Sequence, residues 1–232
     1  MTETALDQRP VVLVHGFGGS AATTWQSNGW MDLIADAGRP VLGIDLLGHG
    51  TAPKPHDPEA YNEMARHVLD ALPDTPVDAI GFSLGARTLI ECARVAPERF
   101  ARLVLTGVGA NLFEEREDHA RIAAAVRGEG DPTDPFIRYF ADIANDPDSD
   151  IEALRALIDR PSSPLAIADL APLTMPVLVL LGDGDFAGPA DPLLEAIPHA
   201  SFTELRRCDH FATPQSMQCL DEALNFVDAS PF

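Results

Sequence analysis

The sequence predicts an α/β fold, with a mostly parallel, twisted sheet flanked by helices. Short apolar runs rich in valine, leucine and isoleucine alternate with longer amphipathic stretches along most of the chain. This alternation is typical of parallel strands joined by helical crossovers. The strand-like runs also lack polar alternation, as expected for strands buried on both faces. The 232 residues are enough for one large domain.

The expected elements follow the apolar runs and the breakers between them. The strands are expected at residues 11–14, 41–45, 77–81, 103–106, 177–181 and 201–205. The helices around them are expected at residues 25–37, 59–72, 84–96, 191–197 and 214–227. Prolines mark the ends of these pieces, where proline is tolerated, at positions 40, 73, 97, 176, 198 and 214.

The alternation breaks once, between residues 110 and 171, where the sequence contains no convincing strand. Helical patterns occur there near residues 114–126, 134–143 and 151–158. A helical stretch of this length between two strands indicates a small cap over the carboxyl edge of the sheet, where ligands bind in open α/β sheets. We therefore expect a core of residues 1–109 and 172–232 and a helical cap of residues 110–171.

The pentapeptide Gly81-Phe82-Ser83-Leu84-Gly85 joins the third expected strand to the helix that follows it. A serine at a sharp strand-to-helix turn needs small residues two positions before and after it, because larger side chains would collide there. This geometry lifts the hydroxyl above the sheet and directs the next backbone N–H to the same place. The context favours a nucleophile elbow, with Ser83 as nucleophile, over a glycine-flanked turn that happens to contain a serine.

A serine hydroxyl needs a base that is oriented by a carboxylate, and in this geometry the acid and then the histidine follow the serine along the chain. His210 follows the last strand at its carboxyl end, whereas His199 lies in the connector before that strand. His210 is therefore the predicted base. Asp185 is preferred as the acid over Asp183, which lies closer to the strand and is expected to cap its turn. Asp209 is a weaker candidate, because adjacent residues in an extended stretch point apart.

Acyl transfer also needs donors for the oxyanion of the tetrahedral intermediate. The backbone N–H of Leu84, next to the nucleophile, is one expected donor. The second is expected from the glycine-rich loop after the first strand, residues 15–19, whose backbone can approach the substrate closely. Phe17 is the predicted donor and Gly16 a predicted substrate contact, while His15 is expected to be structural.

Five segments together resemble the α/β-hydrolase family, in the order that the family has them: HGFGG at 15–19, DLLGHG at 45–50, GFSLG at 81–85, GDGD at 182–185 and DH at 209–210. The resemblance implies a triad of Ser83, His210 and Asp185, an oxyanion hole at Phe17 and Leu84, and a cap inserted after the sixth family strand. The first expected strand corresponds to the family's third, so the antiparallel hairpin that often precedes it is missing or vestigial.

The serine at the elbow resembles the carboxylesterase-like members of the family. This resemblance implies hydrolysis of carboxylic esters, thioesters or lactones through an acyl-enzyme, in the EC 3.1.1 class. We expect a small-molecule acyl substrate, and the cap is expected to shape an apolar pocket for it. The candidate lining residues in the cap are Phe113, Phe136, Phe140 and Leu154.

Other functions remain open. The resemblance to family members with a serine at the elbow also allows carbon–carbon bond hydrolysis, perhydrolysis or proton-abstraction chemistry. The stretch GFSLGAR resembles the elbow of the menaquinone-pathway SHCHC synthase, in which an arginine at the position of Arg87 helps to hold substrate carboxylates. The match departs at Ala86, where that family usually has glycine. Arg87 is therefore a candidate substrate-binding residue. A non-catalytic ligand receptor on the same fold is less favoured, because binding alone needs no activated serine.

The composition limits the partners. The net charge of −20 repels phosphate backbones and anionic membranes, so neither nucleic acid nor membrane is an expected partner. No run approaches the roughly 18 apolar residues of a membrane span, and residues 1–9 do not resemble a signal peptide, so we expect a cytoplasmic protein. The expected assembly is a monomer or a homodimer. No metal and no cofactor are expected, because the histidines and Cys92, Cys208 and Cys219 show no ligand spacing.

Overall fold

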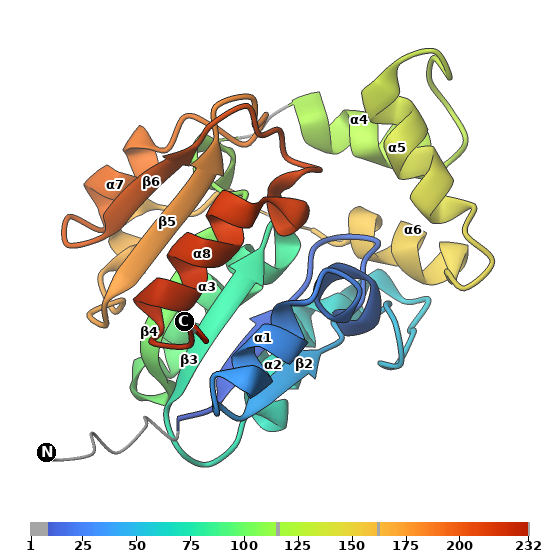
Figure 1. The fold of residues 1–232 in the computed structure, drawn as a ribbon. Coiled ribbons are helices and arrows are strands. Elements are labelled where there is room, and N and C mark those ends of the chain that lie inside the picture. Colours follow the sequence, from blue (N-terminus) through green and yellow to red (C-terminus); the bar gives the residue numbers. More distant parts are fainter. Residues whose placement is uncertain (1–8, 115–116, 162, 232) are drawn as a thin grey trace, which may run out of the picture.

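The computed structural model describes residues 9–114, 117–161 and 163–231, without the side chains of residues 117 and 118. Within these residues, six parallel strands form one sheet in the order β2-β1-β3-β4-β5-β6 (Figure 1). The strands are β1 (Val11–Val14), β2 (Val41–Ile44), β3 (Val77–Phe82), β4 (Phe100–Thr106), β5 (Val177–Gly182) and β6 (Ser201–Leu205). The predicted α/β fold with a parallel sheet is confirmed.

The α-helices also follow the predicted pattern, except at residues 25–37 and in the first part of the segment 59–72, where a 3-10 helix covers Pro58–Glu63. They are α1 (Trp30–Asp36), α2 (Met64–Ala71), α3 (Leu84–Val95), α4 (Glu117–Val126), α5 (Pro135–Ala144), α6 (Ile151–Asp159), α7 (Asp191–Ala196) and α8 (Met217–Phe226). The single helix expected at 25–37 is wrong. A π-helical turn occupies Ala21–Gln26, and α1 begins only after Gly29, whose φ of 79° interrupts the helix. In the described part of the chain, no helix is long and apolar enough to cross a bilayer.

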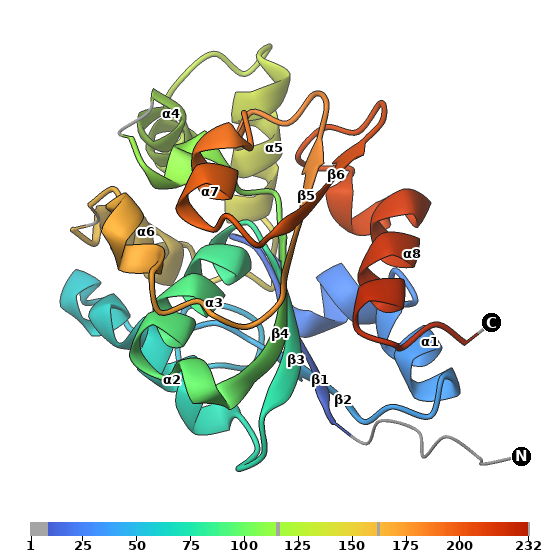
Figure 2. The same cartoon turned by 90° about the vertical axis from the view of Figure 1, so that its left-hand side faces the viewer.

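Strand β1 shows why the sheet needs uninterrupted apolar runs. Val11 and Leu13 pack into the core under α1 and α8, whereas Val12 and Val14 pack into the core under α2, α3 and α7. All four side chains are completely buried. Successive side chains of a strand point to opposite faces, so two helical layers require apolar residues at every position. Figure 2, which views the sheet edge-on, shows the two layers.

The strand order determines where the functional loops meet. Strand β1 lies between β2 and β3, so the order of strand addition reverses at the β1–β3 pair. Ligands of open α/β sheets bind in the crevice outside the carboxyl ends of the strands at such a switch point. Residues 15–19 follow β1, and Ser83 follows β3. The two segments proposed to carry the chemistry therefore lie side by side.

Helices α4, α5 and α6 lie beyond the carboxyl ends of the strands (Figure 1), in the segment for which the cap is predicted. The described residues of this segment contain no strand. Its two ends meet where Leu165 N–H donates to the carbonyl of Leu112 at 2.7 Å. Helix α6 is tied to the core by the hydroxyl of Tyr61, which lies 2.8 Å from the carbonyl oxygen of Ala153.

Candidate active site

Ser83 occupies the sharp turn between β3 and α3. Its backbone has φ of 52° and ψ of −112°, a conformation that non-glycine residues rarely adopt and that costs about 1–3 kcal/mol. The turn is held by two backbone hydrogen bonds, from Ser83 N–H to Thr106 O at 2.8 Å and from Arg87 N–H to Ser83 O at 3.0 Å. The strain is the backbone signature of the predicted nucleophile elbow.

The two glycines of the elbow are required by close approach of backbone to backbone. A Cβ added to Gly81 would lie 2.7 Å from the backbone of Ala86, at the start of α3. A Cβ added to Gly85 would collide with the carbonyl oxygens of Val14 and His15, at the end of β1. Larger residues at either position would thus separate the elbow from the sheet.

His210 lies between the hydroxyl of Ser83 and the carboxylate of Asp185. Its Nε2 is 3.0 Å from Ser83 Oγ, and its Nδ1 is 2.8 Å from Asp185 Oδ1. A carboxylate only accepts hydrogen bonds, so Nδ1 carries the proton and Nε2 is free to accept from the hydroxyl. The Asp185 side chain is completely buried, and its Oδ1 also accepts the N–H of Ala187 at 2.8 Å. The structure thus brings together the three side chains predicted to form a triad.

Two aromatic rings pack against the imidazole of His210. The ring of Phe186 lies 4.2 Å from it, centroid to centroid, and that of Phe82 lies 5.0 Å away. His210 is 5% exposed as a result. These contacts restrict the ring and exclude water around the Asp185–His210 pair, which strengthens their electrostatic interaction. We did not predict them from the sequence, although both phenylalanines adjoin a predicted site residue.

The two rival aspartates have other partners. Asp183 accepts the backbone N–H groups of Arg207 and Cys208 at 2.8 and 3.1 Å, and these hydrogen bonds lower the pKa of its carboxyl group. It therefore ties the loop after β5 to the loop after β6, a longer-range role than capping its own turn. Asp209 accepts the N–H of Ala212 at 2.9 Å.

A cavity of about 490 Å³ extends from Ser83 toward helices α4, α5 and α6. Its walls are mainly apolar and come from the elbow, from the loops after β1, β4, β5 and β6, and from the segment 110–171. The lining residues include Phe17, Phe82, Ser83, Leu84, Val108, Leu112, Ile122, Tyr139, Phe140, Leu157, Phe186 and His210. Of the four cap residues expected to line a pocket, only Phe140 does so. Leu154 is 1% exposed and belongs to the core of the cap, and Phe136 packs against Phe186 instead.

Arg87 and Gly16, the two predicted substrate contacts, are placed differently. Arg87 lines the cavity, but its guanidinium is already engaged with Glu91 Oε1 at 3.2 Å and the carbonyl of Ser163 at 2.8 Å. Gly16 does not belong to the cavity lining, and a Cβ there would lie 2.8 Å from the ring of Phe82. Gly16 therefore acts on the site through the position of its loop.

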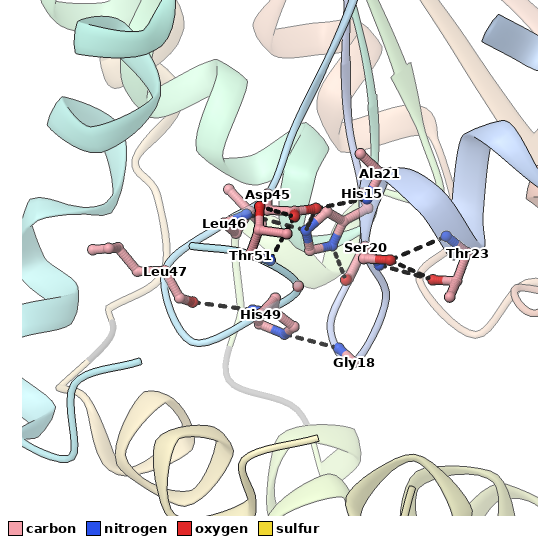
Figure 3. Close-up of polar contacts among 12 residues, drawn as sticks. His15, Gly18, Ser20, Ala21, Thr23, Asp45, Leu46, Leu47, His49 and Thr51 are labelled. Carbon is pink, nitrogen blue, oxygen red and sulfur yellow. Dashed lines mark hydrogen bonds and ion pairs between the residues drawn. The ribbon is translucent and has the colours of Figure 1, made fainter. Parts of the chain in front are cut away.

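Asp45, the first residue of the DLLGHG turn, joins two loops at the rim of the site (Figure 3). Its Oδ1 accepts Ala21 N–H at 2.7 Å, and its Oδ2 accepts the N–H of Thr51 at 2.7 Å and the Thr51 hydroxyl at 2.9 Å. Burial acts to raise the pKa of Asp45, but the hydrogen bonds from Thr51 and Ala21 outweigh it and lower the pKa.

Among the residues that the structure describes, no group of three or more His, Cys, Asp or Glu side chains could hold a metal ion.

A parallel sheet with a serine elbow at its switch point, and with an aspartate and a histidine on the loops after β5 and β6, defines the architecture of an α/β hydrolase. The model of the alpha/beta hydrolase fold family matches residues 9–154, which is more than half of the chain. The protein belongs to this family.

Several individual proteins are similar to the chain. An esterase of Mycobacterium tuberculosis is 32% identical over 156 residues, which cover 62% of this chain and 49% of that protein. The pimeloyl-[acyl-carrier protein] methyl ester esterase of Methylococcus capsulatus is 40% identical over 95 residues, which cover 41% and 35%. The alignments thus span about half, or less, of the lengths of these relatives.

Among solved structures, the 2-hydroxy-6-oxo-6-phenylhexa-2,4-dienoate hydrolase of a Rhodococcus strain superposes with a TM-score of 0.72. The superposition covers 97% of this chain and 92% of that one, at 22% sequence identity. A likeness at this identity extends to the fold and carries no information on the substrate.

Proposed function

We propose that the protein is a serine hydrolase that cleaves carboxylic esters, or alternatively thioesters or lactones, through an acyl-enzyme on Ser83. The observation that carries the proposal is the continuous chain of contacts from Ser83 Oγ through His210 to Asp185, at 3.0 and 2.8 Å. A strained serine on an elbow, held within reach of a correctly oriented imidazole, has no purpose in a protein that only binds a ligand.

In the first half-reaction, Ser83 Oγ attacks the ester carbonyl carbon while its proton passes to His210 Nε2. Asp185 stabilises the imidazolium that forms and holds its Nδ1–H. The negative charge that develops on the carbonyl oxygen is stabilised by the backbone N–H groups of Phe17 and Leu84, both of which line the cavity. The C–O bond to the alcohol then breaks, and His210 returns the proton to the departing alkoxide.

In the second half-reaction, a water molecule attacks the acyl group on Ser83. His210 Nε2 removes a proton from this water, and the same two backbone N–H groups stabilise the second oxyanion. When the bond from Ser83 to the acyl group breaks, the proton returns to Ser83 Oγ. The products are a free carboxylic acid and the starting form of the enzyme.

The cavity supports a small or medium-sized acyl group. Its volume of about 490 Å³ lies within the range of roughly 300–1,000 Å³ that is typical of small-molecule sites. Apolar and aromatic side chains predominate in its lining, which favours a neutral hydrocarbon chain. The two sequence relatives described above are named as esterases and the Rhodococcus structure as a dienoate hydrolase, and none of these names favours the synthase alternative suggested by Arg87.

The test combines a covalent probe with a panel of substrates. A fluorophosphonate should label the wild-type protein once, at Ser83, and should leave Ser83→Ala unlabelled. p-Nitrophenyl esters from acetyl to dodecanoyl should be turned over, with an optimum at short or medium chain length. Failure to label Ser83, together with no turnover of any ester, would contradict the proposed function.

A further inference from the structure

The two peptide planes on either side of the proposed oxyanion donor Phe17 are each held by a buried histidine, His15 or His49. Figure 3 shows both imidazole rings and the hydrogen bond from Gly18 to His49. A peptide unit is planar, so a carbonyl and the following N–H point in opposite directions. The orientation of the Phe17 N–H therefore depends on what holds the carbonyl of Gly16 and, through the backbone rotations of Phe17, on what holds the next peptide plane. That carbonyl accepts from His15 Nδ1 at 2.7 Å and from the N–H of Gly19 at 3.1 Å.

The second plane is the peptide between Phe17 and Gly18. Gly18 N–H donates to Nε2 of His49 at 2.9 Å. With one plane held by His15 and the other by His49, both backbone rotations of Phe17 are restricted, because they are the rotations between these two planes. Loop glycines such as Gly18, whose φ is 73°, are otherwise the most mobile residues of a chain.

The hydrogen bonds determine the tautomer of each ring. His49 accepts from Gly18 N–H at Nε2, so its proton is on Nδ1, which lies 3.0 Å from the carbonyl oxygen of Leu47. His15 accepts the N–H of Leu46 at Nε2, at 3.0 Å, and so its proton is also on Nδ1. Both rings use both nitrogens as neutral imidazoles, and a proton added to either Nε2 would break a bond to the backbone.

His49 is itself held rigidly. The turn that carries it is closed by hydrogen bonds from His49 N–H to Leu46 O at 3.0 Å and from Ala52 N–H to His49 O at 3.0 Å. Its ring is 3% exposed and meets the rings of His15 and Phe17 edge-on, at centroid distances of 5.1 and 5.8 Å. Because the His49 side chain is held in this way, it can keep the loop that it contacts in one position.

We propose that His49 is a positioning residue, which holds the Phe17–Gly18 peptide so that the Phe17 N–H can serve as an oxyanion donor. The inference rests on the proposed function, because it assigns His49 to the oxyanion hole of that reaction. Burial, together with the proximity of His15, lowers the pKa of His49 to about 3, which keeps its Nε2 available as an acceptor at neutral pH.

Two variants test whether the hydrogen-bond acceptor at Nε2, rather than the rest of the His49 side chain, positions the loop. His49→Gln keeps an acceptor near the position of Nε2, whereas His49→Asn keeps only a donor near Nδ1, within reach of Leu47 O. Removing one oxyanion donor outright lowers kcat by about 10²–10³-fold. For a misdirected donor we expect kcat of His49→Asn to fall roughly 10- to 100-fold, with KM within about three-fold of wild type, and His49→Gln to recover most of the loss.

The decisive readout is an alkyl trifluoromethyl ketone, which forms a tetrahedral adduct on Ser83 with its oxygen in the oxyanion hole. Its Ki should rise in His49→Asn by the same factor as kcat/KM falls. His199→Asn is the matched control, because it removes a histidine contact to Met175 O at the far end of the sheet. All values are normalised to the fraction of protein that fluorophosphonate labels.

The outcomes separate the two proposals. If wild type binds the ketone but hydrolyses no ester, the proposed function is wrong, and the ratio of Ki values still decides the role of His49. Equal kcat and Ki in wild type and His49→Asn, or equal losses in His49→Asn and His49→Gln, would overturn the inference while the esterase function stands. A protein that forms no adduct overturns both.

A second measurement does not depend on the folding of any variant. In the ¹⁵N-labelled wild-type protein, the hydrogen bond from Gly18 N–H to His49 Nε2 should give a scalar coupling between these two nitrogens. An observed coupling supports the proposed contact. Its absence, with both resonances assigned, overturns the inference.

Discussion

Ser83 combines backbone strain with the proposed chemistry. Its φ of 52° lifts the hydroxyl from the sheet, and His210 Nε2 then lies 3.0 Å from Oγ. Strained backbone of this kind persists only where surrounding contacts over-determine it, here the close approach of Gly81 and Gly85 to neighbouring backbone. The reactivity of the residue is thus a property of the packing around it.

Removal of the nucleophile or the base tests these roles directly. Ser83→Ala and His210→Ala should each lower kcat by about 10⁴-fold or more, because they act as one unit. The double variant should be little slower than either single one, as measured with a p-nitrophenyl ester. Losses that multiply in the double variant would show that the two residues act independently.

The choice of acid is tested by a pair of conservative changes. Asp185→Asn should be nearly as severe as loss of the base, about 10⁴-fold in kcat, because an amide no longer fixes the proton on His210 Nδ1. Asp183→Asn should affect mainly the loop it holds, with kcat within about ten-fold of wild type. The opposite order of severity would assign the catalytic role to Asp183.

The lowered pKa values of His49 and His15 predict how the free energy of unfolding depends on pH. Burial, the largest cause for both, lowers the pKa of each below the value of 6.5 for an unfolded chain. Both rings therefore gain protons on unfolding in acid, so the free energy of unfolding is greatest above about pH 6.5 and falls as the pH is lowered. Between about pH 4 and 5.5, His49→Gln should flatten this dependence by roughly one proton, or about 1.4 kcal/mol per pH unit, in urea titrations. Parallel curves for the two proteins would contradict it.

The candidate triad could be predicted because each member directly follows an expected strand. Parallel strands present their carboxyl ends at one edge of the sheet, so residues that follow different strands are expected at that same edge. The role of His49 could not be predicted in this way. Its contact with Gly18 spans 31 residues and depends on how two loops meet, for which the sequence carries no periodic signal.

Helix α5, which belongs to the predicted cap, packs against two loops of the site. Its aromatic residues contact the loop after β5 through Phe136 and Phe186, 5.1 Å apart, and the loop after β6 through Phe140 and Phe211, 5.8 Å apart. The same helix therefore closes the cavity and packs against the neighbours of His210. The position of α5 should set the size of the acyl group that fits.

Truncation of a single ring on α5 tests this point. Phe140 is 4% exposed and lines the cavity. Phe140→Ala should shift the optimum of kcat/KM to longer p-nitrophenyl esters and should destabilise the fold by up to about 3–5 kcal/mol, because it leaves a void. Phe202→Ala, on the exposed side of β6, is the control and should leave the optimum unchanged. An unchanged optimum in Phe140→Ala would place the acyl group elsewhere.

The strands were predictable to within three residues at each end, since both faces of the sheet select apolar residues. The helix expected at 25–37 was not, because its amphipathic pattern continues across a glycine. Gly29 adopts a positive φ that a helix does not permit, and Trp25 and Trp30 still pack together in the core, 5.0 Å apart, from two separate turns. Apolar periodicity alone does not distinguish one helix from two such pieces.

For the whole molecule, the net charge of −20 acts on any charged substrate before it reaches the site. The resulting field slows the approach of anions and is screened by salt. For a monoanionic ester, kcat/KM should therefore rise about two- to three-fold between roughly 10 and 150 mM ionic strength. A neutral ester of the same length serves as the control and should show no trend. A fall for the anionic ester would indicate a local cationic site that dominates the field of the protein.

Trapping the acyl group on the enzyme tests the proposed roles of Ser83 and His210 directly. We predict a burst of p-nitrophenol of about one equivalent, followed by acid quenching that preserves an acylated protein whose modification maps to Ser83. His210→Ala should show neither the burst nor the adduct on the same timescale. Turnover without acylation, or an acyl group on another residue, would contradict the central claim that the imidazole of His210 activates the hydroxyl of Ser83.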